Sequence, residues 1–369
     1  MSEQIQPEGT PQGKLENIVN VPCDNCGSEM VYDPGNEGLL CNHCGHTRSI
    51  PKASDMVEER SYRDALNMST QPTGYGVETK VFHCNNCGAE TAVDPDQVAF
   101  DCPFCGSTNV NAEAHDAKVI TPSGVLPFKV TRKQANEKFN EWLGQGFFAP
   151  GNLTAIAKLD KLHGVYLPFW TYDAFCQSHW TAMAGYHYYE TEYYTDSDGN
   201  QQSKQVRKTR WVPTSGYFEH SFDDVLVLGS QGLKQKFTEK IFPFDLNEVV
   251  NYDSRYILGM ESEVYQKDVK EGFDVAEGIM DGMIKSMIQK EIPGDTHKQL
   301  RIRTHKDDIT FKHVLLPIWI AAYDYNGKIY RFLVNGQTGK ISGKKPVSTG
   351  KIIALIVFIV AIITTIVLL

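Results

Sequence analysis

The chain has 369 residues, 41% of them hydrophobic, and a formal net charge of −9 at pH 7. This length allows two or three domains with packed cores, and the acidic balance argues against a protein that binds polyanions over its whole surface. Eight of the nine cysteines stand in CxxC pairs, which fits metal ligation in a reducing cytosol better than a disulfide scaffold.

Residues 1–20 are polar and contain several prolines and glycines, so we predict a disordered N-terminus without a signal peptide. Two similar units follow, at 21–50 and 81–110. Each has two CxxC turns separated by fourteen residues, and the second copy lies 61 positions after the first. The repeated cysteines are Cys23, Cys26, Cys41 and Cys44, then Cys84, Cys87, Cys102 and Cys105. This indicates an internal duplication.

Two facing CxxC turns place four thiolates around one point, which is the ligand set of a structural zinc ribbon. We therefore predict two structural Zn²⁺ ions, each with its four positions filled by protein. Disulfides, free thiols and a redox CxxC motif are the alternatives, and the paired spacing and the duplication favour zinc. His43 and His46 are interpreted as bystanders to a complete cysteine set. A glycine follows every second cysteine, as a tight turn toward the sulfur requires.

The charge of the two ribbons indicates which kind of partner they can bind. Residues 23–45 and 84–106 each contain four acidic residues and no lysine or arginine, whereas contacts to nucleic-acid phosphates require cations. We therefore predict that the ribbons are protein-docking modules. Flexible linkers are expected at 51–80, with a short helix near 58–66, and at 111–124.

Residues 125–345 are predicted to form a central mixed α+β domain with antiparallel hairpins. Thr131 is the expected N-cap of a helix that ends near Gly144. Alternating and aromatic-rich runs predict strands at 165–175, 180–194, 204–212 and 221–228, with a hairpin turn at 196–200. The ninth cysteine, Cys176, lies in such a run and is interpreted as a buried thiol.

The clearest helix is predicted at 266–290, because apolar residues recur there at helical spacing. They are Phe273, Ala276, Met280, Met283 and Met287. The methionines are interpreted as core, with a docking surface as the alternative. A second β region is expected at 313–323, 328–334 and 340–342, with turns at Asn326-Gly327 and 335–339. Leu167-Pro168-Phe169-Trp170 and Leu316-Pro317-Ile318-Trp319 suggest a second duplication.

The sequence contains no phosphate-binding, metalloprotease or hydrolase motif, so no enzyme activity is expected. Asp223 and Asp224 with His220 are a weak candidate for a carboxylate site, and a solvated strand end is the preferred interpretation. The predicted hairpin also carries cations opposite tyrosines: Lys204, Arg207, Lys208, Arg210 and Trp211 face Tyr186, Tyr188, Tyr189, Tyr193 and Tyr194. Single-stranded bases or lipid headgroups would suit this patch. Cross-strand pairing with Glu190 and Glu192 is the preferred interpretation.

Residues Ile352–Leu369 form an apolar run interrupted only by two threonines. As a helix it is about 27 Å long, close to the thickness of the hydrocarbon core of a bilayer. A helix that is apolar on every face is typical of a membrane span, so we predict a transmembrane tail anchor at 351–369. The basic residues Lys344, Lys345 and Lys351 favour a cytoplasmic location for everything before it.

Several phrases resemble those of a bacterial family of membrane proteins with TFIIB-type zinc ribbons. They are Leu167–Ala174, Phe222–Val227, Pro243–Leu246, Lys312–Trp319 and Val334–Gly339. The resemblance covers the ribbons and about 125–345. Some members are labelled PriA-like helicase or phage replication protein, although this chain has no motor motif. The chain also resembles YdjG-type membrane anchors of Gram-positive bacteria, and this resemblance implies an SPFH-domain protein and a PspA-type envelope-stress protein as partners.

We therefore expect a bacterial single-pass membrane protein whose bulk lies in the cytoplasm. Its expected role is that of an adaptor that captures a protein partner, while Ile352–Leu369 fixes the complex to the inner surface of the cell membrane. One alternative is a membrane-associated nucleic-acid-binding protein with a replication-related role. The other is an enzyme of unknown class that uses the aromatic domain as a pocket.

Overall fold

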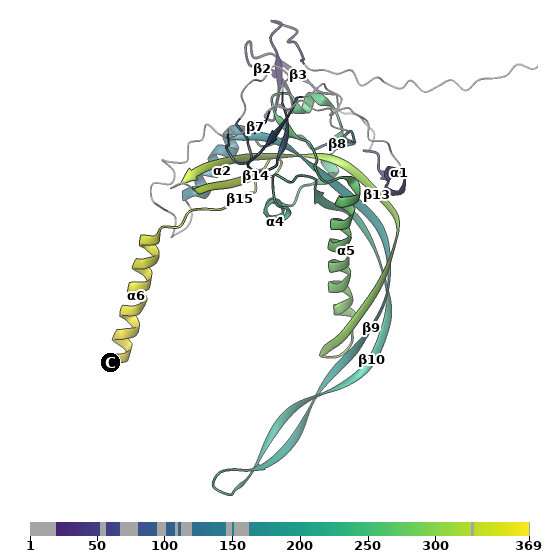
Figure 1. Ribbon diagram of the computed structural model, residues 1–369, viewed down its shortest axis with the longest axis vertical. Helices are drawn as coiled ribbons and strands as arrows, with labels where there is room; N and C mark the ends of the chain where they lie inside the picture. The colour runs from purple at the N-terminus through teal and green to yellow at the C-terminus, as the bar shows by residue number, and fades with distance from the viewer. Residues whose placement is uncertain are drawn as a thin grey trace, which may run out of the picture.

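The computed structural model describes residues 20–51, 57–66, 80–93, 101–107, 110–111, 120–144, 150, 162–325 and 328–368. Within these residues the chain has an α+β architecture in which three long strands curve around one helix (Figure 1). The strands are β9 (His163–Thr195), β10 (Gln201–Leu228) and β13 (Thr296–Tyr325), and the helix is α5 (Val269–Glu291). The N-terminus predicted to be disordered lies outside the described residues, apart from residue 20.

Strands β9 and β10 form one antiparallel hairpin, interrupted by a bulge after Phe222. At its tip, Oδ1 of Asp196 accepts hydrogen bonds from the backbone N–H groups of Asp198 and Asn200, which closes the predicted turn. The two predicted arms are confirmed, but the strands extend much further. At about 3.3 Å per residue, the 33 residues of β9 span about 110 Å. The strand predicted at 221–228 is the end of β10.

Strand β13 pairs antiparallel with β9 on the side opposite β10. Its pairing with β9 begins at Gly185, so beyond Gly185 the hairpin continues as a two-stranded ribbon (Figure 1). The two similar Leu-Pro phrases lie side by side, because Leu316 pairs with Leu167. The sheet continues past β13 through β14 (Lys328–Asn335) and β15 (Ile341–Gly343). The predicted turn at Asn326-Gly327 lies outside the described residues.

The base of β9 is buried on both faces, whereas its middle is buried on one. Val165, Leu167 and Phe169 point into one core cluster, and Tyr166 and Trp170 point into another. This explains the unbroken apolar run, because a strand covered on both sides needs no polar face. Further along, burial alternates, and the buried residues are Ala174, Cys176, Ser178, Trp180, Ala182 and Ala184.

Helix α5 covers that buried face. It begins with a capping box in which Asp268 accepts from the N–H of Glu271 and Glu271 accepts from the N–H of Asp268. Its buried residues are Val269, Gly272, Phe273, Ala276, Met280, Ile284 and Ile288. The predicted helix is confirmed, but the predicted stripe is wrong at Met283, which is 42% exposed, and Met287 is only half-buried. The buried stripe passes through Ile284 instead, four residues after Met280.

Shorter elements cover the remaining edges. Helix α2 (Arg132–Gly144) ends at the predicted glycine, and its first turn is capped by Thr131 Oγ1, which accepts from the N–H of Gln134. The helix expected near 58–66 is reduced to α1 (Tyr62–Ala65), preceded by β4 (Arg60–Ser61) on the edge of β13. The others are β8 (Gly124–Val125), α4 (Gln235–Thr238), η2 (Glu239–Ile241), η3 (Leu246–Glu248), β11 (Val250–Asn251), η4 (Ser254–Ile257) and β12 (Glu261–Glu263).

Both cysteine-rich units pack against the central domain instead of standing apart on their linkers. The first unit forms its own sheet, β1 (Met30–Asp33), β2 (Gly38–Cys41) and β3 (Thr47–Ser49). The second, β5 (Lys80–Cys84), β6 (Glu90–Val93) and β7 (Val110–Asn111), joins the main sheet because β12 bridges β6 and β9. Apolar ribbon residues find partners in the core, whereas the linkers predicted at 51–80 and 111–124 lie mostly outside the described residues.

The chain ends with α6 (Thr349–Leu368), which projects away from the other elements (Figure 1). Its residues Thr349–Ile366 are long and apolar enough to cross a membrane, and none of this span is buried against the described protein. The predicted C-terminal apolar helix is therefore confirmed as a helix.

Candidate metal centres

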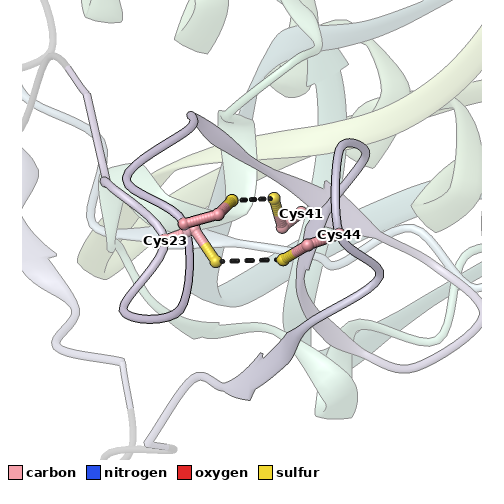
Figure 2. A group of neighbouring side chains, drawn as sticks. Cys23, Cys41 and Cys44 are labelled. Carbon is pink, nitrogen blue, oxygen red and sulfur yellow. Dashed lines mark hydrogen bonds between the residues drawn. The ribbon is translucent and has the colours of Figure 1, made fainter.

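The first ribbon brings four cysteine sulfurs within 4.8 Å of one another (Figure 2). Sγ of Cys23 lies 3.6 Å from Sγ of Cys44, and Sγ of Cys26 lies 3.5 Å from Sγ of Cys41. Cys41 ends β2, and the opposite turn leads through an isolated bridge into β1. The strand pair therefore holds the two CxxC turns face to face.

The second ribbon repeats this geometry. Sγ of Cys84 lies 3.5 Å from Sγ of Cys105, and Sγ of Cys87 lies 3.6 Å from Sγ of Cys102. Cys84, the counterpart of Cys23, ends β5. The structure thus assembles all eight predicted ligands into the two predicted sets.

These distances fit a tetrahedral metal ion and do not fit disulfides. A disulfide would place two sulfurs about 2.05 Å apart, and all nine cysteines are free. Four sulfurs at about 2.3 Å from a central zinc ion would lie about 3.8 Å apart, which is close to the separations of 3.5 and 3.6 Å. Each cluster could therefore hold one metal ion. His43 and His46 are not part of the first cluster, as predicted.

The glycine after each second cysteine has a positive φ, between 70° and 76°. These residues are Gly27, Gly45, Gly88 and Gly106. Each donates its N–H to the carbonyl of the first cysteine of its turn. A side chain would strain this left-handed conformation, so the glycines close the turns that aim the sulfurs.

Local hydrogen bonds make at least one thiol of each cluster acidic. In the first cluster, a hydrogen bond from the His46 backbone lowers the pKa of Cys44. Hydrogen bonding to the Ser28 side chain lowers the pKa of Cys26 to about 5, and hydrogen bonding to Cys102 lowers the pKa of Cys87 to about 5. Because thiolate is the form that binds metal, each cluster presents a ready ligand at neutral pH.

The two ribbons differ in exposure although their motifs match. In the second ribbon, the turn from Cys102 to Cys105 is buried, and Phe104 is 0% exposed among core residues such as Leu167. In the first ribbon, the corresponding residues Asn42 and His43 are exposed. The second ribbon is therefore a component of the core, whereas the first presents its metal-binding turns to solvent.

The first ribbon touches the domain along one edge. Tyr32 donates its hydroxyl to the carbonyl of Phe128 at 3.1 Å and packs against Tyr256, with ring centroids 5.5 Å apart. The N–H of Tyr32 also donates to the carbonyl of Leu258. These contacts fix the ribbon on the domain and leave its far side open.

The candidate carboxylate site at His220, Asp223 and Asp224 is only partly formed in the structure. Asp223 and Asp224 lie with Asp173, their carboxylate oxygens within 4.8 Å of one another. Asp224 is countered by Lys312 at 2.8 Å, and Asp173 accepts from the N–H of Asp224 and from Thr310. His220 is absent from this group and stacks on aromatic neighbours of its own strand. The hydrogen bonds and the ion pair of this cluster stabilise the bulges of β10 and β13, where Asp224 and Asp308 have positive φ.

The hairpin patch is a set of cross-strand pairs. Nζ of Lys208 lies 2.6 Å from Glu190 and 3.3 Å from Glu192, and Lys204 also pairs with Glu192. The projecting segment 186–210 contains four acidic and four basic residues, so it carries no net charge. This agrees with the preferred interpretation of paired side chains on an exposed sheet.

One cleft was missed in the sequence. It lies beside Cys87, has a volume of about 690 Å³, and collects five cationic residues: Lys234, Lys236, Lys240, Arg331 and Lys344. They come from three separate parts of the chain, which is why no contiguous motif marks them. The local sequence indicates the cleft only through three closely spaced lysines, at positions 234, 236 and 240.

Comparison with known proteins gives one informative similarity. The chain is 27% identical over 348 residues to the uncharacterized protein YdjG of Bacillus subtilis (strain 168), covering 91% of this chain and 93% of that protein. No protein-family model matches the chain, and no solved structure matches it. The similarity extends over nearly the whole length of both proteins.

Proposed function

We propose that this protein is a membrane-anchored zinc-ribbon adaptor that recruits protein partners to the inner surface of the bacterial cell membrane. The observation that carries the proposal is α6, a helix of 20 residues whose apolar side chains have no cover among the described residues. Phe358 is 62% and Ile366 67% exposed. Side chains of this kind need an apolar environment, and a helix about 30 Å long matches the hydrocarbon core of a bilayer.

Zn²⁺ is the metal we propose for both clusters, because four thiolates in tetrahedral array suit it and leave no open position for substrate. Zinc in the second ribbon would hold part of the core together. Zinc in the first ribbon would hold an exposed surface that contains Asn25, Asn42 and His43. We propose this surface as the site that captures the partner.

The partners we propose are SPFH-domain and PspA-type proteins. The support is the resemblance to YdjG-type membrane anchors together with the acidic character of the first ribbon. The exposed Glu29 is one of its acidic residues. A second, Asp24, forms an ion pair with Arg48, whose Nη1 lies 3.1 Å from Oδ2 of Asp24. A nucleic-acid partner is less well supported, because the hairpin lysines are engaged by glutamates.

The proposal is tested by crosslinked affinity purification of the full chain from native membranes. Asn42→Arg with His43→Arg places two bulky cations on an exposed turn of the first ribbon and replaces no cysteine. We expect recovery of the SPFH-domain or PspA-type partner to fall at least tenfold, because charge and bulk at the centre of an interface weaken binding strongly.

The matched control is Ser286→Arg with Gln289→Arg, which adds the same charge at two exposed positions of α5. It should leave partner recovery unchanged, and both variants should stay in the membrane fraction. Undiminished recovery with the first-ribbon variant would rule out the docking surface. Recovery of nucleic acid and replication proteins in place of these partners would favour the nucleic-acid alternative.

A further inference from the structure

We propose that the cationic cleft beside the second ribbon binds the phosphate headgroup of an anionic phospholipid. This inference rests on the proposed membrane anchor and adds a second contact between the protein and the bilayer. Its evidence is the composition of the cleft and its position in the chain.

Three parts of the fold build the cleft. The segment 231–240, which includes α4, supplies Lys234, Lys236 and Lys240, and all three are exposed. Arg331 of β14 is half-buried, and Lys344 follows directly after β15. Hydrogen bonding fixes the last two relative to each other, because the N–H of Lys344 donates to the carbonyl of Arg331. The cations are therefore held on the same framework as the main sheet.

The charges of the cleft are not balanced by its own walls. No acidic residue is among those that line it. Within the described part of the chain, no carboxylate lies within salt-bridge distance of Lys234, Lys236, Lys240 or Arg331. Glu263 lies behind the wall at Gly232 and is buried, where it accepts a hydrogen bond from Ser230.

A metal ion at Cys87 does not cancel this charge. A zinc ion with four thiolates carries about two negative charges, whereas Lys234, Lys236, Lys240 and Arg331 alone bring four positive charges to the cleft. The excess of positive charge is unusual in a chain with a net charge of −9. A concave site lined by one sign of charge concentrates ions of the opposite sign.

The position of the cleft selects the lipid as the source of the phosphate. Lys344 lies five residues before the first residue of α6, so the extended chain between them spans at most about 18 Å. Lys345 is still held by the domain, with Nζ 4.3 Å from the centre of the Trp142 ring. If α6 crosses the bilayer, the cleft therefore stays close to the headgroup layer.

The remaining lining residues suit an amphipathic ligand. Phe237, which is half-buried, supplies apolar surface beside the lysines, and Asn86 and Gln231 supply amide groups that can donate hydrogen bonds to phosphate or glycerol oxygens. A headgroup could thus place its phosphate among the cations while its glycerol and first methylene groups contact Phe237.

The test uses the full chain in detergent micelles and measures the Kd for added phosphatidylglycerol by native mass spectrometry. The variant replaces Lys234, Lys236 and Lys240 by Gln. Each lysine near an anionic surface strengthens binding about fivefold, so we expect the triple variant to bind about 100-fold more weakly. The matched control, Lys270→Gln with Lys285→Gln and Lys290→Gln, removes the same charge from exposed positions of α5 and should bind like the wild type.

Two further ligands separate the possible sources of binding. Phosphatidylcholine bound as tightly as phosphatidylglycerol would overturn the anionic site, and inorganic phosphate bound as tightly as the lipid would overturn the lipid assignment. Equal losses in the triple variant and its control would also overturn it. Insertion into phosphatidylcholine bilayers is measured separately: a chain that inserts but shows no preference for phosphatidylglycerol disproves this site alone, whereas a chain that does not insert disproves the anchor.

Discussion

At the scale of single residues, the centre of the domain is organised by buried polar groups as well as by apolar ones. His313 is 0% exposed and lies between the rings of Trp170 and Tyr265, at centroid distances of 4.7 and 5.3 Å. Its Nδ1 is 2.8 Å from the carbonyl oxygen of Ile120. A carbonyl can only accept, so the neutral ring carries its proton on Nδ1. Burial lowers the pKa of His313 to about 3.

This pKa predicts how stability depends on pH. The unfolded histidine titrates near pH 6.5. Between pH 6.5 and about 3, His313 is therefore protonated in the unfolded state but neutral in the folded state. The wild type should therefore lose about 1.4 kcal/mol of unfolding free energy per pH unit as pH falls through this window, relative to His313→Gln. Denaturant unfolding of both proteins at pH 7.5, 6 and 5 measures the difference. A difference that does not change with pH would contradict the buried neutral histidine.

At the scale of elements, the duplicated ribbons show how one motif serves two structural roles. Both have the same turns, the same glycines and nearly the same sulfur separations. The first keeps its own three-stranded sheet, whereas the strands of the second extend the main sheet through β12. The four cysteines are the same in both ribbons, so the difference lies in the packing around them. This packing buries the second ribbon in the core and leaves the first at the surface.

This difference predicts unequal effects of losing one metal ion. On the proposal that each cluster holds one zinc ion, Cys44→Ser and Cys105→Ser should each reduce the bound zinc from two ions to one, measured by mass spectrometry of the full chain in mild detergent. Cys105→Ser should lower the unfolding free energy of the central domain by about 3 kcal/mol more than Cys44→Ser, because it frees the buried Phe104 turn from the core. Equal destabilisation by the two variants would show that the first ribbon is as integral to the core as the second.

Local patterns in the sequence predicted the elements well but not their extent. The cysteine spacing predicted both metal clusters, and the Asp196–Asn200 turn predicted the hairpin, because both depend on residues that are near neighbours. The length of β9 depends on β13, more than a hundred residues away, which a local pattern does not report. Met283 was wrongly predicted to be buried because α5 has neighbouring apolar stripes through Met283 and through Ile284. Only the packing of the helix against the sheet decides which stripe is buried. The cleft was missed because its cations meet only after folding.

At the scale of the whole molecule, three features join into one account. The first ribbon presents an open surface, the second ribbon ties the N-terminal region into the sheet, and the last strand leads within a few residues to α6. A partner captured by the first ribbon would thus be held near the membrane by a continuous hydrogen-bonded framework. The recruitment of a partner to the membrane depends on α6 being inside a bilayer.

The most direct test of that claim is the distribution of the protein after cell lysis and an alkaline carbonate wash, which removes peripheral proteins. The full chain should stay with the membranes, and a chain that ends at Ser348 should move to the soluble fraction, because only α6 offers an uncovered apolar surface of membrane length in the described protein. Protease added to intact spheroplasts should leave the ribbons uncut, as the proposed cytoplasmic location requires. A full chain that washes off with carbonate, or a truncated chain that stays with the membranes, would contradict the account.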